Sequence, residues 1–387
     1  MEGQFKILVV DDEPDLEPLM LQRMRRHIRS GHYSFVFASN GVEALQVLER
    51  EEDIDMVLSD INMPQMDGLT LLDQIPKVDP NVRSVIISAY GDMKNIRTAM
   101  NRGAFDFVTK PLDFDDLQIT IERTLAHLLE WREALTTRDK LVSLQNELSV
   151  ASNIQQSILP TEFPRGAAYS TYASMEPARN VGGDFYDVIH LDQGRIGLAI
   201  ADVSDKGVPA ALFMMSSRTL LKGAAIGKYD PGPVLQEVND LLCENNDTMM
   251  FVTLLYAVYD PSTGRLTYAN GGHTTPVVQH KDGTSTLLPL TGGIALGIAE
   301  GLEYSQQTVE ILPGDVVAFY TDGVSEAMNE NGEEFGVHRL DQVMHTLTSN
   351  DPKEVNQAIF EAVRAFAGNT PQSDDITCLT LCRFEET

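Results

Sequence analysis

The chain has 387 residues, 43% of them hydrophobic, and a formal net charge of −28 at pH 7. Such a length and composition predict two or three domains with sizeable cores, while the negative charge repels phosphate backbones and argues against nucleic-acid binding. Three cysteines without a CxxC pair argue against a disulfide framework and favour the cytoplasm, and no apolar run approaches the roughly 20 residues needed to enter and span a membrane.

The first third of the chain alternates short apolar strands with segments of helical length. Strands are predicted over residues 5–10, 35–38, 56–59, 85–88 and 105–108, with helices over segments such as 16–28 and 42–48. This alternation predicts a doubly wound α/β fold, in which helices cover both faces of a parallel sheet. Ligands of such folds bind at the carboxyl ends of the strands.

Charged residues stand where several of the predicted strands end. Asp11 and Asp12 follow the first strand, Asp60 follows the third, and two later strands run into Asp202 and Asp322. A buried carboxylate carries a desolvation cost that a divalent cation can offset, so these positions indicate ion binding. Aspartates that begin turns would explain any single case, but they explain the recurrence poorly.

Residues 113–159 predict one long helix, because the segment lacks glycine and internal proline and Pro160 follows it. Leucine and isoleucine recur at intervals of three or four, although the repeat is imperfect around residues 136–139. Two interpretations stay open. The helix either forms a two-chain coiled coil or packs on its own domain.

After Pro160 the chain becomes rich in strands and paired glycines. Strands are predicted over residues 185–189, 195–201, 253–259, 265–269 and 316–320, and helices over 209–221, 233–243 and 355–366. Because strands and helices do not alternate strictly, antiparallel sheets flanked by helices are expected. Asp202 and Asp322 continue apolar rows of period two, and an oxygen-rich site without cysteine or histidine suits magnesium or manganese.

Residues 5–125 resemble the receiver domain of two-component response regulators, through the order and spacing of Asp11, Asp12, Asp60, Ser88 and Lys110. The resemblance implies a flavodoxin-like fold, with Asp60 in VLSDINMPQMDG as the phosphoacceptor. It implies a Mg²⁺ ion bound by Asp11, Asp12, Asp60 and the backbone carbonyl of Asn62. Ser88 would hydrogen-bond the phosphoryl group and Lys110 would form an ion pair with it. Phe107 matches the family's aromatic switch position and is expected in the core.

Residues 148–383 resemble the metal-dependent PPM serine/threonine phosphatases of the SpoIIE-type branch. The resemblance is carried by segments that include IQQSILP, VGGDFYD, ADVSDKGVPAAL, LPGDVVAFYTDGVSEA and SDDIT. It implies an α+β fold, an antiparallel β-sandwich flanked by helices, that binds two Mg²⁺ or Mn²⁺ ions. The implied ligands are Asp184, Asp202, the Val203 backbone carbonyl, Asp322 and Asp374, with Asp187 and Asp375 as further candidates. Arg179 is expected to be a surface charge and His273 a structural histidine.

Together, the two resemblances imply a response regulator with a receiver at 1–125, a helical linker at 126–160 and a phosphatase domain at 161–387. Phosphorylation of Asp60, by a sensor histidine kinase or a phosphotransfer protein, would gate the phosphatase. The implied substrate is a phosphorylated anti-sigma factor antagonist with a STAS domain, in a partner-switching pathway. A homodimer through the linker helix is a further possibility. The alternative is a catalytically silent adaptor that binds a sigma factor or an anti-sigma regulator.

Overall fold

The computed structural model describes residues 4–51, 53–89, 91–244, 246–347 and 349–385. Its internal contacts divide the chain into two compact units, with the division between Ser143 and Leu144. Within the described residues, no helix has both the length and the apolar character required to cross a bilayer. Each unit has its own sheets and its own hydrophobic core.

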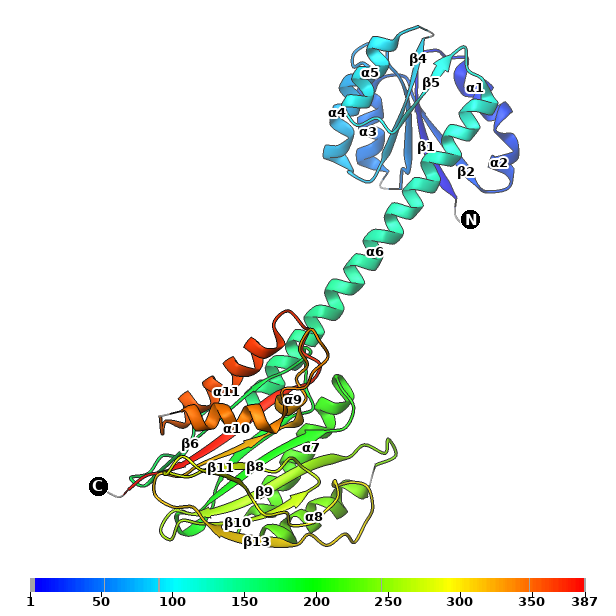
Figure 1. Ribbon diagram of the computed structural model, residues 1–387. Helices are drawn as coiled ribbons and strands as arrows, with labels where there is room; N and C mark the ends of the chain where they lie inside the picture. The colour runs from blue at the N-terminus through cyan, green and yellow to red at the C-terminus, as the bar shows by residue number, and fades with distance from the viewer. Residues whose placement is uncertain (1–3, 52, 90, 245, 348, 386–387) are drawn as a thin grey trace. The chain divides into compact units, whose positions relative to one another are not determined.

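The first unit is a five-stranded parallel sheet with the order β2-β1-β3-β4-β5 (Figure 1). This order is that of flavodoxin-like folds and confirms the predicted class. The strands are β1 (Phe5–Val10), β2 (Tyr33–Ala38), β3 (Met56–Asp60), β4 (Arg83–Ala89) and β5 (Asp106–Lys110).

Helices cover both faces of this sheet. One face packs against α1 (Leu16–Arg23), α2 (Arg25–Arg29) and the start of α6 (Phe114–Ile158). The other face packs against α3 (Gly41–Arg50) and α4 (Gly68–Val78), and α5 (Met93–Asn101) adds a smaller cluster. The single helix predicted over residues 16–28 is divided into α1 and α2 at Met24, whose ψ of 8° departs from helical values.

Phe107 is the one residue of the first unit whose predicted burial is wrong. It lies on β5, at the edge of the sheet, and 37% of its surface is exposed. The neighbouring Val108 is 1% exposed, because alternate residues of a strand point to opposite faces. The edge strand thus directs Val108 into the core and leaves Phe107 at the surface.

Helix α6 is continuous over 45 residues, as predicted from its lack of glycine and internal proline. Its first turns bury Leu117, Ile121, Leu125 and Leu128 in the core of the first unit. At its other end, Ile158 and the following Leu159 pack in the core of the second unit. Between these ends the helix carries exposed large apolar side chains, namely Leu129, Trp131, Leu141, Val142, Leu144, Val150 and Ile154.

The second unit consists of two five-stranded sheets, and each strand pairs with its neighbours in antiparallel orientation, which confirms the predicted sandwich. The first sheet has the order β13-β10-β9-β8-β7: β13 (Gln306–Glu310), β10 (Arg265–Gly271), β9 (Val252–Asp260), β8 (Ile196–Val203) and β7 (Phe185–His190). The second has the order β12-β11-β14-β15-β6: β12 (Ser285–Leu287), β11 (Val277–Gln279), β14 (Val316–Tyr320), β15 (Ile376–Arg383) and β6 (Tyr169–Glu176).

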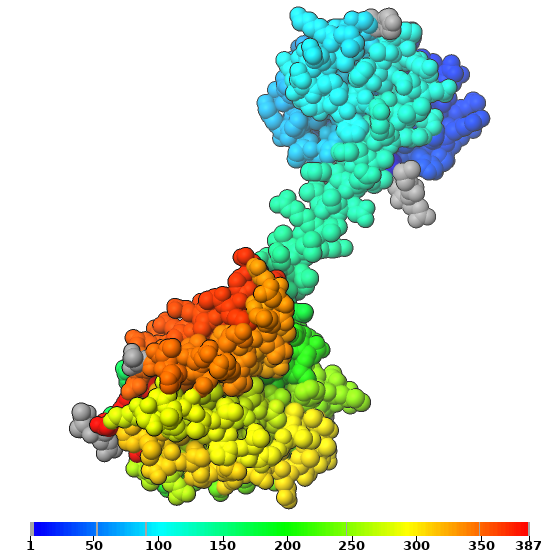
Figure 2. Space-filling model, in the orientation of Figure 1, coloured from blue at the N-terminus to red at the C-terminus, as the bar shows by residue number. Residues whose placement is uncertain are grey.

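Two pairs of helices form the outer layers of this sandwich. Helices α7 (Val208–Ala225) and α8 (Pro231–Cys243) cover the first sheet, and α10 (Gly336–Thr346) and α11 (Pro352–Ala367) cover the second. The space-filling view shows α10 and α11 as an orange and red layer on this unit (Figure 2). The 3₁₀ turn η1 (Asp192–Gly194) and the four-residue helix α9 (Asp322–Ser325) complete the unit.

Candidate functional site

The first unit gathers its predicted phosphorylation residues at the carboxyl ends of three strands. Asp11, Asp12 and Asp60 each offer a carboxylate oxygen, and these oxygens lie within 4.8 Å of one another. Lys110, at the end of β5, donates hydrogen bonds from Nζ to Oδ2 of Asp60 at 2.9 Å and to Oδ2 of Asp11 at 3.0 Å. Neighbouring parallel strands end at one edge of the sheet, so residues up to 99 positions apart meet there.

The charges of this cluster are strongly coupled. Burial raises the pKa of Asp11, because it penalises the carboxylate form. Burial by itself would lower the pKa of Lys110. Hydrogen bonds to Glu13, Asp60 and Asp11 outweigh this effect and raise the pKa of Lys110 above its ordinary value. Glu13, whose Oε1 lies 2.8 Å from Lys110 Nζ, was not singled out from the sequence, although it continues the Asp11-Asp12 run.

Ser88 and Asn62 are the two remaining residues predicted for the phosphorylation site. Ser88 lies on β4, is 1% exposed, and its Oγ has no hydrogen-bond partner among the described residues. A buried hydroxyl without a partner carries a cost that a ligand oxygen would remove. Asn62 lies two residues beyond Asp60, in the loop after β3. Hard carboxylate oxygens with a nearby hydroxyl and ammonium group suit a magnesium ion and a phosphoryl group.

The second unit brings four aspartates to the ends of paired strands. Asp184 precedes β7 and Asp202 lies near the end of β8, while Asp322 follows β14 and Asp374 precedes β15. Phe185 pairs with Ala201 and Tyr320 pairs with Cys378, so in each sheet the start of one strand adjoins the end of its neighbour. Antiparallel pairing therefore places two aspartates at this end of each sheet.

Burial and neighbouring carboxylates act together on the pKa values of these aspartates. Burial, followed by the charges of Asp202 and Asp375, raises the pKa of Asp184 well above its usual range. Burial, followed by the charge of Asp322, raises the pKa of Asp202 to about 7. Burial and the charge of Asp374 raise the pKa of Asp322. Like charges held together out of water are the condition that a bound cation relieves.

Two threonines hold Asp184 in place. Thr321 Oγ1 and Thr377 Oγ1 donate hydrogen bonds to Asp184 Oδ2, at 2.7 and 2.5 Å. All three side chains are buried. The threonines were not singled out from the sequence, although each lies beside a motif aspartate: Thr321 precedes Asp322, and Thr377 follows Asp375 by two residues. With Oδ2 occupied in this way, Oδ1 of Asp184 is the oxygen left for an ion.

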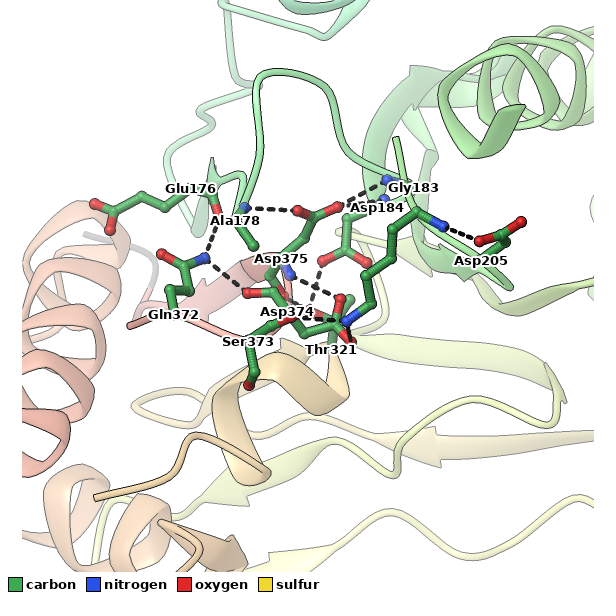
Figure 3. A network of polar contacts seen from close by, with 11 residues as sticks. Glu176, Ala178, Gly183, Asp184, Asp205, Thr321, Gln372, Ser373, Asp374 and Asp375 are labelled. Atoms are coloured by element: carbon green, nitrogen blue, oxygen red, sulfur yellow. Dashed lines mark hydrogen bonds and ion pairs between the residues drawn. The ribbon is translucent and has the colours of Figure 1, made fainter. Parts of the chain in front are cut away.

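The two aspartates of the SDDIT segment have different partners (Figure 3). Asp375 Oδ1 accepts from the Ala178 N–H at 2.8 Å, and Oδ2 accepts from the Gly183 N–H at 2.7 Å. Its carboxylate is therefore engaged by main-chain amides on both oxygens. Asp374 instead accepts from Lys206 Nζ at 2.8 Å, and both of these side chains are partly exposed.

The paired glycines beside Asp184 are required by close contacts. A Cβ atom on Gly182 would lie 2.2 Å from Oδ2 of Asp375, and one on Gly183 would lie 2.9 Å from the carbonyl oxygen of Val203. Any larger residue would have to displace a carboxylate or the main chain at these positions. The Val203 carbonyl, a predicted ligand, is thus packed directly against the loop that carries Asp184.

Three other candidates have surroundings that point away from ion binding. Asp187, on β7, is 2% exposed at its side chain and forms an ion pair with Arg218 of α7, with Nη2 3.0 Å from Oδ2. Arg179 is exposed. His273 is buried, Nδ1 lies 2.8 Å from Thr253 Oγ1, and burial lowers its pKa to about 3, so the imidazole is neutral at pH 7.

The carboxylate set of the second unit fits divalent cations. Asp322 Oδ1 is buried and has no hydrogen-bond partner within the part of the chain that the structure describes. An ionised oxygen in that position would be unfavourable without a cation beside it. The available donors are carboxylates and main-chain carbonyls, which bind magnesium and manganese rather than softer metals.

Both units match known families. Residues 7–122 match the response regulator receiver domain, and residues 192–384 match the family described as stage II sporulation protein E (SpoIIE). The chain therefore combines a receiver domain with a SpoIIE-type phosphatase domain of the PPM class, a class that depends on Mg²⁺ or Mn²⁺.

Individual proteins are similar to parts of this chain. The chain is 32% identical over 220 residues to the phosphoserine phosphatase RsbU of Bacillus subtilis. This match covers 57% of this chain and 65% of RsbU. The chain is 33% identical over 267 residues to protein IcfG of Synechocystis, covering 61% of this chain and 41% of IcfG. The chain is also similar to the solved SiaA-PP2C domain of Pseudomonas aeruginosa. The match covers 64% of this chain and 99% of that domain, with 26% identity and a TM-score of 0.55. The chain thus spans less than two thirds of the two full-length relatives.

Proposed function

We propose that this protein is a response regulator whose output is the metal-dependent hydrolysis of phosphoserine or phosphothreonine in another protein. The observation that carries the proposal is the convergence of Asp184, Asp202, Asp322 and Asp374 at the strand ends of a SpoIIE-type domain. The similarity to a phosphoserine phosphatase supports the same reaction. The three parts proposed are a receiver at 1–125, a linker at 126–160 and a phosphatase at 161–387.

In the phosphatase, these four aspartates and the Val203 carbonyl would hold two Mg²⁺ or Mn²⁺ ions. Bound ions would lower the pKa of a coordinated water and polarise the phosphoryl oxygens. The protein's own contribution is to orient the ligands: Thr321 and Thr377 fix Asp184, and Asp375 fixes the amide of Gly183. By resemblance to the family, Asp202 would serve both ions, and the charges of Asp322 and Asp374 both raise its pKa.

In the receiver, Asp60 would accept the phosphoryl group from a sensor histidine kinase or a phosphotransfer protein. Asp11, Asp12, Asp60 and the Asn62 carbonyl would hold Mg²⁺, while Ser88 and Lys110 would bind the phosphoryl oxygens. Lys110 already bonds to Asp60, so phosphorylation would change the partners of its ammonium group. Because α6 packs against this unit through Leu117 and Leu128, that change can bias the helix leading to the phosphatase.

The proposed partners rest on the resemblance to the SpoIIE-type phosphatases. We assign as substrate a phosphorylated anti-sigma factor antagonist with a STAS domain, in a partner-switching pathway of sigma-factor control. The three cysteines are free, which is in keeping with a reducing cytoplasm. A homodimer through α6 is supported by the exposed side chains of Leu141, Leu144, Val150 and Ile154, which a second helix would cover.

The deciding experiment is the release of phosphate from a phosphorylated STAS-domain protein by the full chain with Mn²⁺. We expect activity in the wild type and its loss in Asp322→Asn, and we expect acetyl phosphate to change the rate in the wild type but not in Asp60→Asn. If the wild type and Asp322→Asn are equally inert with and without acetyl phosphate, the adaptor function replaces the enzymatic one. Light scattering that finds only monomers, with and without acetyl phosphate, would remove the dimer.

A further inference from the structure

The last turn of α6 contacts a loop of the phosphatase site through one side chain. Gln155 is 3% exposed, and its amide forms two hydrogen bonds with the main chain of Gly182. Nε2 donates to the Gly182 carbonyl oxygen at 2.6 Å, and Oε1 accepts from the Gly182 N–H at 3.1 Å. The next residue, Gln156, is exposed. Two adjacent glutamines on one helix thus differ in burial and in the contact with Gly182.

Gly182 contacts the metal site on its other side. A Cβ atom built on it would lie 2.2 Å from Oδ2 of Asp375, and the same oxygen accepts from the N–H groups of Gly183 at 2.7 Å and Asp184 at 3.4 Å. Residues 182–184 are therefore held between an amide from α6 and a carboxylate at the start of β15. Asp184 is the first ligand candidate after this contact, so its position depends on these two supports in addition to Thr321 and Thr377.

We infer that Gln155 is a positioning residue, through which the end of α6 sets the affinity of the phosphatase site for its ions. The inference rests on the proposed function, because it takes Asp184 to be an ion ligand. Hydrogen bonds of this kind span only about 2.7–3.2 Å. A shift of α6 by the rise of one residue, about 1.5 Å, would break both contacts with Gly182.

The consequence is a route from the linker to the ions. Helix α6 begins at Phe114, where it packs in the core of the first unit, and Ile158 packs in the core of the second. A rotation or translation of α6 would withdraw the Gln155 amide from Gly182 and leave Asp375 as the main support of the loop. Asp184 would then be less ordered, and ions would bind more weakly.

The test compares Gln155→Met and Gln156→Met in the full chain. Methionine keeps the length of glutamine and removes its polar atoms, and Gln156→Met makes the same change at the exposed position. Mn²⁺ affinity is measured by titration calorimetry, and the exchange of the Gly182 amide by hydrogen–deuterium exchange. We expect Gln155→Met to weaken Mn²⁺ binding roughly 10-fold, to speed amide exchange in residues 178–184, and to regain phosphatase activity at high Mn²⁺. Gln156→Met should match the wild type.

An unchanged Mn²⁺ affinity in folded Gln155→Met would overturn the inference. If that variant fails to fold, Gln155→Ala takes its place under the same criterion, because the smaller side chain lets water bond to Gly182. A wild type that binds Mn²⁺ but hydrolyses no phosphoprotein would refute the proposed function alone, since the affinity is measured directly. A wild type that binds no Mn²⁺ would overturn both.

Discussion

Lys206 Nζ donates a hydrogen bond to Oδ2 of Asp374 at 2.8 Å and another to the main-chain oxygen of Ser373 at 2.7 Å. The ammonium group therefore occupies the carboxylate that we assign to an ion. Lys206 and a divalent cation must compete for Asp374, or share its two oxygens. The strength of this ion pair consequently enters the apparent affinity for the metal.

Replacing Lys206 with glutamine should strengthen Mn²⁺ binding. The pair is partly exposed, and such pairs contribute up to about 1 kcal/mol, which corresponds to an affinity gain of about fivefold or less. Titration calorimetry measures the change, with Lys222→Gln on α7 as the control. A weaker affinity in Lys206→Gln would show that the lysine assists the ion instead of competing with it.

The substitution Gly182→Ala should sharply reduce phosphatase activity, because the new methyl group would lie 2.2 Å from Oδ2 of Asp375. The displaced carboxylate would lose its bond to Gly183, and we expect a loss of roughly 10- to 100-fold, as for other residues that support metal ligands. Gly223→Ala is the matched control, since its added Cβ meets nothing within 4 Å on helix α7. It should keep full activity and gain up to about 1 kcal/mol in stability.

Asp187→Asn should destabilise the fold by about 3–5 kcal/mol, because it would leave Arg218, whose side chain is only 11% exposed, without a charged partner. Any protein that remains folded should bind Mn²⁺ with the affinity of the wild type. Glu176→Gln breaks an exposed ion pair with Arg364 and should cost under about 1 kcal/mol. Thermal unfolding and calorimetry separate the two effects, and a folded Asp187→Asn that no longer binds Mn²⁺ would restore Asp187 as a ligand.

The stability of the protein in EDTA should fall as the pH rises. The pKa of Asp202 is 3.8 in its ordinary state and about 7 in the fold, so over this window the folded protein binds more protons than the unfolded chain. Stability then declines with increasing pH between these values. Asp202→Asn should flatten this dependence, raise the melting temperature in EDTA at pH 7.5, and lose the stabilisation that Mn²⁺ gives. A pH dependence equal to that of the wild type would contradict the assignment.

Acetyl phosphate should label the chain at Asp60 and at no other residue. Asp60→Asn should abolish it, whereas Asp139→Asn, at an exposed position of α6, should leave it unchanged. Lys110→Ala should slow labelling without abolishing it, since Lys110 is paired with Asp60 but is not the acceptor. Residual label on Asp60→Asn would identify a different phosphoacceptor.

Periodicity in the sequence was sufficient to predict the five strands of the first unit and, in the second unit, strands β7, β8, β9, β10 and β14. It did not predict β6 or β15, because Thr377 and Thr380 interrupt the apolar pattern of β15 although both are fully buried. It also gave the wrong environment for Phe107, since a strand's place at the edge of a sheet is a tertiary property. Partners such as Lys206 and Asp374 are 168 positions apart, and only the folded arrangement brings them together.

Strand β15 has a consequence for biosynthesis. It lies between β14 and β6, and it bonds to Tyr169–Glu176 along its whole length. As the chain emerges from the ribosome, about two hundred further residues must therefore be synthesised after β6 before its neighbour β15 exists. Asp374 precedes β15. A nascent chain can therefore complete neither the second sheet nor the set of four aspartates before β15, which ends at Arg383, has been synthesised.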